Sequence, residues 1–286
     1  MTRVASIGVT GSRGVIGRQL VQIANLLPDL TVSSYDGDIR DAEEVKLWAR
    51  EASPDMVFHL AAVVPTVSAA SDKAYAREVN EFGTAIFARA VLEGARGRPV
   101  RFVYTSTSHV YQSNENPISE QGSLEPRNFY ATTKLGGERA LQFLASTEQN
   151  FDLVVARVFS IYSEFQSPSF LFPSLVKKIT PGMHRQKIEL PGWNNVRDFL
   201  HARQAAELLL LLSRSRSSGV VNLGSGFGRS IKGFAEDIFG VELEVRECDA
   251  DPDPASLVAE TGFLASAIGV DRFKKIAGEA PAISSG

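Results

Sequence analysis

The chain has 286 residues, of which 44% are hydrophobic and 22% charged, a composition that suits one large α/β domain or two closely joined lobes. The 30 basic and 33 acidic side chains leave a formal net charge of −3, so no bulk positive field favours nucleic acid as a partner. The single cysteine, Cys248, excludes an intrachain disulfide.

Apolar runs and helical patterns alternate through the first two thirds of the chain. The runs expected to be strands are Val4–Val9, Met56–Val64, Val100–Thr105 and Leu153–Val158. The segments expected to be helices are Val15–Leu26, Ala74–Glu93 and Tyr130–Ala145. Almost continuously apolar strands separated by helices predict a doubly wound α/β fold, with a parallel sheet covered on both faces.

The alternation of apolar strands and helices ends after Phe159, where serine, proline and phenylalanine become frequent. A helix at Arg203–Leu212 and a strand at Val220–Leu223 are expected to return to the main sheet, whereas Val241–Val245 alternates as a half-exposed strand does. We therefore expect a dinucleotide-binding domain at 1–165 with about 201–225, and a smaller C-terminal substrate lobe at 166–200 and 226–276. Residues 277–286 lack an apolar pattern, and we expect a disordered tail there.

No segment is typical of a membrane span or a secretory signal. The most apolar stretch, Leu208–Leu212, is far shorter than the roughly 20 residues that cross a bilayer. The chain opens on a strand pattern that runs directly into a glycine-rich loop. We expect a soluble, cytoplasmic protein without a membrane partner.

The glycine-rich loop, residues 10–17, lies between the first predicted strand and the first predicted helix. Gly11 permits a tight turn, Gly14 lets the backbone approach a pyrophosphate, and Gly17 lets the helix pack closely on the strand. The N–H groups at the start of the helix would face the phosphates. The cofactor contacts predicted in this loop are Gly11, Arg13, Gly14, Val15, Ile16 and Gly17.

Tyr130 and Lys134 stand four residues apart on a predicted helix and therefore project from the same face. A phenol with a pKa of about 10 is a poor acid or base at neutral pH. A neighbouring ammonium favours the phenolate and lowers that pKa.

These motifs resemble those of extended short-chain dehydrogenases/reductases, with the loop Thr-Gly-x-x-Gly-x-x-Gly and the helix motif Tyr-x-x-x-Lys. In that family a Ser or Thr precedes a Val-Tyr pair by three residues, and Thr107 has this place before Val110-Tyr111. The resemblance implies a Rossmann-type fold and a catalytic triad. Tyr130 would protonate the substrate oxygen, Lys134 would hold Tyr130 and the cofactor ribose, and Thr107 would orient the oxygen.

Further matches follow in chain order. Asp38 and Ile39 resemble the family's adenine-facing pair, and Val79-Asn80 fits the Val-Asn of the next helix. The residues after His59 resemble the strand end that lines the cofactor. The cofactor contacts that the resemblance adds are Asp38, Ile39, Leu60, Ala61, Ala62, Tyr130 and Lys134.

The choice between NADP(H) and NAD rests on the second strand. An acid about twenty positions after the loop accepts the ribose 2′-hydroxyl of NAD. Asp36 is the nearby candidate, but we assign it to the Gly-Asp element rather than to a strand tip, because the segment is shortened as in GDP-fucose synthases, which use NADPH. Residues that could hold a 2′-phosphate, or simply be solvated, are Arg13, Arg18, Ser33 and Ser34. NADP(H) is favoured, NAD is the alternative, and no metal is expected.

Two residues beside Thr107 bear on the reaction. Sugar dehydratases have an Asp-Glu pair where this chain has Ser108-His109, so the acid and base for elimination of water are missing. GDP-fucose synthases pair a cysteine with a downstream histidine for epimerisation, and the counterpart of that histidine is Phe170. His109 either contacts the sugar or caps the strand end.

Substrate recognition is predicted downstream. Arg197-Asp198 begins an element that resembles the Arg-Asp-Phe motif of nucleotide-sugar enzymes, where the planar, charged guanidinium binds the diphosphate. The alternative is a surface ion pair between Arg197 and Asp198. Ser160 replaces an asparagine that often contacts substrate phosphate. The predicted substrate contacts are Ser108, His109, Ser160 and Arg197.

Three functions remain open at this point. The leading hypothesis is an oxidoreductase that reduces a 4-keto-6-deoxy sugar nucleotide with NADPH. The runner-up is a nucleotide-sugar 4-epimerase with retained NAD, and the third is a non-enzymatic nucleotide-sensing protein. In most relatives the helices matching 74–93 and 130–145 pair across a two-fold axis, so the resemblance also implies a homodimer.

Overall fold

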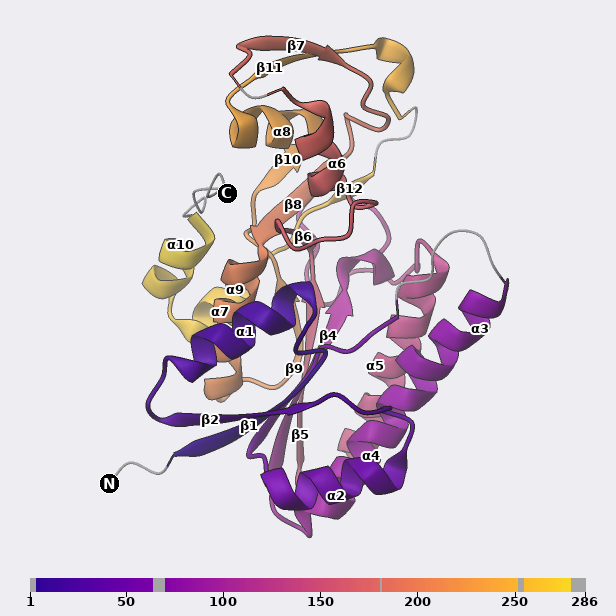
Figure 1. The fold of residues 1–286 in the computed structure, drawn as a ribbon, viewed down its shortest axis with the longest axis vertical. Helices are drawn as coiled ribbons and strands as arrows, with labels where there is room; N and C mark the ends of the chain where they lie inside the picture. Colours follow the sequence, from indigo (N-terminus) through magenta and orange to yellow (C-terminus); the bar gives the residue numbers. More distant parts are fainter. Residues whose placement is uncertain (1–3, 64–69, 181, 252–254, 279–286) are drawn as a thin grey trace.

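The computed structural model describes residues 4–63, 70–180, 182–251 and 255–278 (Figure 1). Its centre is a parallel sheet of six strands in the order β2-β1-β3-β4-β5-β9. The strands are β1 (Ala5–Thr10), β2 (Leu30–Tyr35), β3 (Met56–His59), β4 (Val100–Thr107), β5 (Phe151–Val158) and β9 (Gly219–Leu223). The return of the segment around 220 to the main sheet is thus confirmed.

Helices cover both faces of the sheet, as the Rossmann-type prediction requires. On one face lie α1 (Val15–Asn25) and α7 (Ala202–Arg214), whose apolar sides pack on Ile7, Val9 and Val154. On the other face lie α2 (Ala42–Ala52), α4 (Thr84–Ala95) and α5 (Phe129–Thr147), packed on Val57, Phe102 and Val155. Figure 1 shows the two layers on opposite sides of the sheet.

The expected continuous helix at 74–93 is wrong in one respect. The structure has α3 (Ala70–Arg77), then a π-helical turn, η1 (Glu78–Gly83), and then α4. Asn80 is buried in this turn, and its side-chain amide exchanges two hydrogen bonds of 2.8 Å with the backbone of Val63 and donates at 3.0 Å to Thr133 Oγ1. Such turns occur frequently at functional sites.

The strand expected at Met56–Val64 is also shorter than predicted, because the chain leaves the sheet after His59. Beyond that point one backbone bond to β1 remains, from Leu60 N to Thr10 O at 3.2 Å, and the following residues bond to side chains. Ala61 N donates to Thr10 Oγ1 at 3.2 Å, and Val63 is held by Asn80. Residue 64 lies outside the described residues.

A smaller lobe sits at the carboxyl ends of the strands, at the top of Figure 1. Its strand β8 (Val196–His201) pairs with β6 (Ser160–Tyr162), β10 (Gly228–Ser230) and β12 (Ser256–Leu257). A second ribbon pairs β7 (Arg185–Ile188) with β11 (Glu242–Val245), the strand expected at 241–245. Helices α6 (Leu171–Lys178) and α8 (Ile231–Phe239) complete a separate apolar core.

The end of the described chain differs from the expected division. Helices α9 (Gly262–Ile268) and α10 (Val270–Gly278) lie in the stretch assigned to the substrate lobe. Leu264, Ile268 and Phe273 instead join the core that α1 and α7 form over the main sheet, because they supply the apolar face that covers α7. The expected tail begins inside α10, and its residues from 279 lie outside the described part.

None of the helices in the described residues is long and apolar enough to cross a membrane.

Candidate active site

A cavity of about 810 Å³ lies between the main sheet and the smaller lobe. It is bounded by the glycine-rich loop after β1, by the ends of β3 to β5, by the start of α5, and by residues of β6, β8 and α6. Neighbouring strands β1 and β3 are followed by crossovers to opposite sides, which makes this edge the topological switch point where open α/β sheets bind ligands.

Gly11 and Gly17 occupy positions at this edge that no larger residue fits. Gly11 has φ +68°, and a Cβ there would lie 2.7 Å from Ala61 N. A Cβ on Gly17 would lie 2.1 Å from the Gly11 carbonyl oxygen, so helix and loop pack backbone to backbone. Gly14 is the N-cap of α1 and, with Val15 and Ile16, lines the cavity. This cradle at a helix N-terminus fits the pyrophosphate of a dinucleotide.

The position of Asp36 corrects the sequence interpretation. Strand β2 pairs with β1 in register along its whole length, up to Thr10 opposite Tyr35, so Asp36 follows directly at the strand tip. Its carboxylate accepts from Arg13 Nη2 at 2.8 Å and from Ser12 Oγ at 3.2 Å. Ser33 Oγ accepts from Trp48 Nε1 at 3.0 Å, and its contact with a 2′-phosphate stays a prediction.

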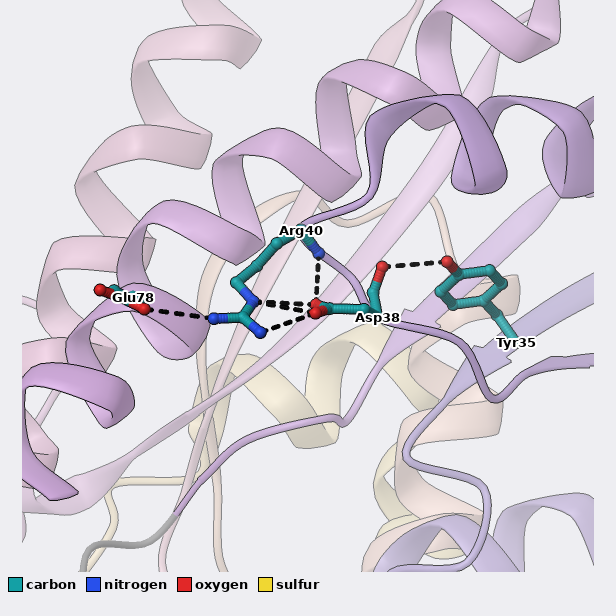
Figure 2. A network of polar contacts seen from close by, with 4 residues as sticks. All are labelled: Tyr35, Asp38, Arg40 and Glu78. Atoms are coloured by element: carbon teal, nitrogen blue, oxygen red, sulfur yellow. Dashed lines mark hydrogen bonds and ion pairs between the residues drawn. The ribbon is translucent and has the colours of Figure 1, made fainter.

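Asp38 lies in a network with Arg40, Glu78 and Tyr35 (Figure 2). The Arg40 guanidinium contacts both Asp38 oxygens, the shortest distance being 2.7 Å, and holds the pKa of that carboxyl below its usual value. Arg40 also reaches Glu78 at 3.2 Å. The Ile39 side chain is buried in the apolar core beside α2 and α4. An adenine contact by Asp38 and Ile39 stays a prediction.

Two of the three residues of the predicted triad, Thr107 and Tyr130, line the cavity, and Lys134 does not. Thr107 ends β4 and lines the cavity together with Tyr130, and its Oγ1 accepts from His109 N at 3.2 Å. Asn128 caps α5 by accepting from Ala131 N at 2.8 Å, which places Tyr130 in the first helical turn. Lys134 follows one turn later and is buried behind the cavity wall.

Burial controls the protonation of Tyr130 and Lys134. It raises the pKa of Tyr130 to about 12 and lowers the pKa of Lys134 to about 7, with Glu138 opposing the second shift. The sequence predicts a phenol acidified by the ammonium, whereas burial is the cause that acts on Tyr130 here, and it favours the protonated phenol. Tyr130 is therefore a protonated phenol at neutral pH, the form that donates a proton.

The far end of the cavity is cationic. Arg197 lines it, and its guanidinium donates to the backbone oxygens of Val196 at 2.8 Å and Ala255 at 2.6 Å. Burial, and then repulsion from Arg127, lower the pKa of Arg197 to about 10. Burial, Arg197 and Arg127 lower the pKa of His109 to about 4, so this cavity-lining imidazole is neutral at pH 7.

One predicted substrate contact and the alternative interpretation of Arg197 need correction. Ser108 is buried and does not line the cavity, because the chain turns into a short 3₁₀ helix, residues 108–110, directly after Thr107. Asp198 is also no surface partner of Arg197. Its buried carboxylate accepts from Ser225 N and Oγ, from Gly226 N and from Ala259 N, at 2.6–3.1 Å.

Of the other predicted contacts, Leu60 and Ser160 line the cavity, whereas Arg13, Asp38, Ile39, Ala61 and Ala62 are not among the lining residues. Sequence reasoning missed Asn128, Gln166, Leu171 and Phe199, which do line it. Asn128 had a signal, since an asparagine just before a helix is a common N-cap. Gln166 had none, because its stretch shows no periodicity.

The sheet, its two helical layers and the glycine cradle define a Rossmann-type α/β protein. Residues 7–224 match the family described as "NAD dependent epimerase/dehydratase family", and the chain belongs to that family.

Among curated proteins, GDP-6-deoxy-D-mannose reductase of Pseudomonas aeruginosa is 30% identical over 263 residues, with 87% of this chain and 83% of the relative covered. UDP-glucose 4-epimerase of Streptomyces lividans is 29% identical over 300 residues, with 91% and 89% covered. Both reductases and epimerases of sugar nucleotides are thus relatives.

Among solved structures, RMD from Pseudomonas aeruginosa complexed with NADPH has a TM-score of 0.77 and 26% identity, with 93% of this chain and 92% of that chain covered. MoeE5 in complex with UDP-glucose and NAD has a TM-score of 0.72 and 25% identity, with 93% and 92% covered. Relatives therefore bind NADPH or NAD. The chain is a member of a family of NAD(P)-dependent nucleotide-sugar reductases and epimerases.

Proposed function

We propose that the protein is an NADPH-dependent reductase of a 4-keto-6-deoxy sugar nucleotide. The observation that carries the proposal is the set of groups around the cavity. Tyr130 offers a proton and Thr107 a hydroxyl, whereas none of the described residues that line the cavity is an aspartate or glutamate. Reduction of a ketone needs one proton donor, but elimination of water needs an acid and a base together.

Each residue of the predicted triad would have its own role in the reduction. Thr107 Oγ1 hydrogen-bonds the carbonyl oxygen and orients it, and Tyr130 donates its phenolic proton to that oxygen as the carbonyl is reduced. The nicotinamide cofactor, when bound, supplies the hydride. Lys134, from behind Tyr130, stabilises the phenolate that remains until a proton from solvent replaces the one transferred.

The distal part of the cavity suits the nucleotide diphosphate. Arg197 is fixed there by its bonds to backbone carbonyls, and Asp251 acts on it electrostatically. A largely buried guanidinium of this kind favours an anionic ligand. Asp198 holds the backbone of Ser225, Gly226 and Ala259 beside it and so fixes the strand that carries Arg197. Ser160 and the neutral His109 would contact the sugar.

The glycine cradle, the start of α1 and Leu60 would hold the cofactor, and Asp38 would contact the adenine. NADPH is favoured by the similarity to RMD, whose structure is complexed with NADPH. With NADPH, Arg13 would release Asp36 and bind the 2′-phosphate. With NAD, the Asp36 carboxylate would accept the 2′-hydroxyl of the ribose. Comparing the dissociation constants of NADPH and NADH in Arg13→Ala and Asp36→Ala would decide between them.

The second candidate is a 4-epimerase that retains NAD, favoured by the 29% identity to UDP-glucose 4-epimerase over most of both chains. The same triad would oxidise the sugar at C4 and then reduce it from the other side. Here Tyr130 would first act as the base, which needs a phenolate that burial disfavours in this structure.

One experiment separates the two candidates. The purified protein is given NADPH and a 4-keto-6-deoxy sugar nucleotide, and the absorbance of the reduced nicotinamide is followed while the sugar nucleotide is analysed by chromatography. Stoichiometric loss of NADPH with formation of the 4-hydroxy sugar supports the reductase. In a parallel reaction the protein is given NAD and a 4-hydroxy sugar nucleotide. Interconversion of its 4-epimers without net change of the nicotinamide refutes the reductase in favour of the epimerase.

A further inference from the structure

Lys134 carries its ammonium into a fully buried place. Its side chain is 1% exposed, on the face of α5 that packs against the main sheet. The nearest acid along the helix, Glu138, is already bound by Arg157, whose Nη2 lies 2.7 Å and whose Nε lies 3.1–3.2 Å from the carboxylate. The charge of Lys134 therefore has no dedicated carboxylate of its own among the described contacts.

The group that does face this ammonium is an aromatic ring. Lys134 Nζ lies 4.1 Å from the centroid of the Tyr104 ring. Tyr104 belongs to β4, three residues before Thr107, and is completely buried. A cation at this distance from the face of a desolvated ring is attracted more strongly than one at an exposed site.

The Tyr104 ring is held in place from several directions. Its hydroxyl donates to the backbone oxygen of Lys134 at 3.3 Å, and its face stacks with His59 at 5.8 Å and 19°. A Cβ on Gly137 would lie 2.5 Å from the Tyr104 hydroxyl, so only a glycine lets α5 approach so closely. The ring has no room to swing away from the ammonium.

We propose that Tyr104 is a positioning residue of the active site, whose ring face keeps Lys134 in its ammonium form and directs it along α5 toward Tyr130. The inference rests on the proposed function, because it matters for catalysis only if Lys134 supports Tyr130. The cation–π contact that favours the charged lysine can be tested without measuring turnover.

The other titratable groups around Lys134 have defined states. His59, packed from β3, is kept neutral by burial and by Lys134, which lower its pKa to about 3. Tyr104 and Tyr130 are protonated phenols, since burial raises the pKa of each. Glu138 on α5 favours the ammonium of Lys134, but Arg157 from β5 neutralises it.

The remaining charge near the ring is Glu81 on η1, which acts on Tyr104. Burial of Lys134 is the dominant influence and lowers its pKa to about 7. At neutral pH the lysine is thus near its titration point, where loss of the ring would convert it largely to the free amine.

The test measures the titration of Lys134 directly. The protein is labelled with [ε-¹³C]lysine, and the Lys134 resonance is identified by its absence in Lys134→Met. We expect it to titrate near 7 in the natural protein and in Tyr104→Phe, which keeps the ring. In Tyr104→Leu, which removes the ring, we expect a pKa lower by about one unit, as a cation–π contact of about 1.4 kcal/mol implies.

Turnover supplies a second readout with a defined sign. Activity that needs the ammonium is present below the pKa of Lys134 and is lost as pH rises through it. Tyr104→Leu should therefore move the alkaline limb of kcat/KM about one pH unit toward acid, whereas Tyr104→Phe should leave it in place. A residue that only fills space would lower activity without moving the limb.

Two results would overturn the proposal. One is an unchanged Lys134 titration in Tyr104→Leu, and the other is an equal shift in Tyr104→Phe, which would assign the effect to the hydroxyl. If Tyr104→Leu does not fold, replacement of Tyr104 by 3,4,5-trifluorophenylalanine weakens the ring face at nearly the same volume, and the same fall in pKa is required. If the Lys134 titrations are as expected but the natural protein does not reduce the sugar nucleotide, only the proposed function is refuted.

Discussion

Replacing Arg157 by methionine should destabilise the protein strongly, because it breaks an ion pair buried beneath the catalytic helix. The guanidinium and the Glu138 carboxylate are 4% and 1% exposed, and their shortest contact is 2.7 Å. Arg157 Nη1 also donates to the backbone oxygen of Glu120 at 3.3 Å. In Arg157→Met the Glu138 carboxylate would stay buried without its partner.

The expected loss follows from the cost of an uncompensated buried charge, which is about 3–5 kcal/mol when one member of such a pair is removed. A loss of 1 kcal/mol lowers the melting temperature of chains of about this size by roughly 2–4 °C. We therefore expect Arg157→Met to melt at least about 6 °C below the natural protein. Replacing both charges by apolar groups of similar volume is often neutral or stabilising.

The assay is equilibrium unfolding in urea, followed by circular dichroism, for Arg157→Met, Glu138→Leu and the double variant. The double variant should recover most of the stability lost in Arg157→Met, because neither member of the ion pair is then left without the other. A loss below about 1 kcal/mol in Arg157→Met, or a double variant no more stable than that single variant, would refute the reasoning. Either result would mean that solvent reaches the pair.

The other predictions concern activity and assembly. Tyr130→Phe keeps the packing of α5 but lacks the proton donor. Its kcat should fall by at least about 100-fold, the usual contribution of general acid catalysis, while the dissociation constant of NADPH changes little. An active variant would contradict the assignment of the triad. Given NAD and an intact nucleotide-linked hexose, the protein should form no 4-keto-6-deoxy product, because Ser108 is buried and the neutral His109 cannot be acid and base at once. Accumulation of that product, detected by chromatography, would show that the protein is a dehydratase. Phe82 and Phe143 are exposed on η1 and α5, and we expect these elements to pair in a homodimer of twice 31.0 kDa; light scattering at micromolar concentration that gives the single-chain mass would exclude it.

The sequence by itself was sufficient for the family and the sheet, because their signals are local. The glycine spacing at 11, 14 and 17 is imposed by contacts within one strand-loop-helix unit, as the clash of a Cβ on Gly17 with the Gly11 carbonyl shows. The alternation of apolar strands with helices reflects burial on both faces of a parallel sheet. Tyr130 and Lys134 were identified for a similar reason, since one helical turn separates them.

What only the tertiary structure decided depends on groups far apart in the chain. The π-turn at η1 exists where Asn80 reaches Val63 and Thr133, and no helical periodicity encodes that reach. Asp36 became a partner of Arg13 because β2 pairs with β1 to its last residue. The protonation states of Tyr130 and Lys134 likewise follow from burial, which depends on every element packed around them and cannot be read from the spacing of the two residues.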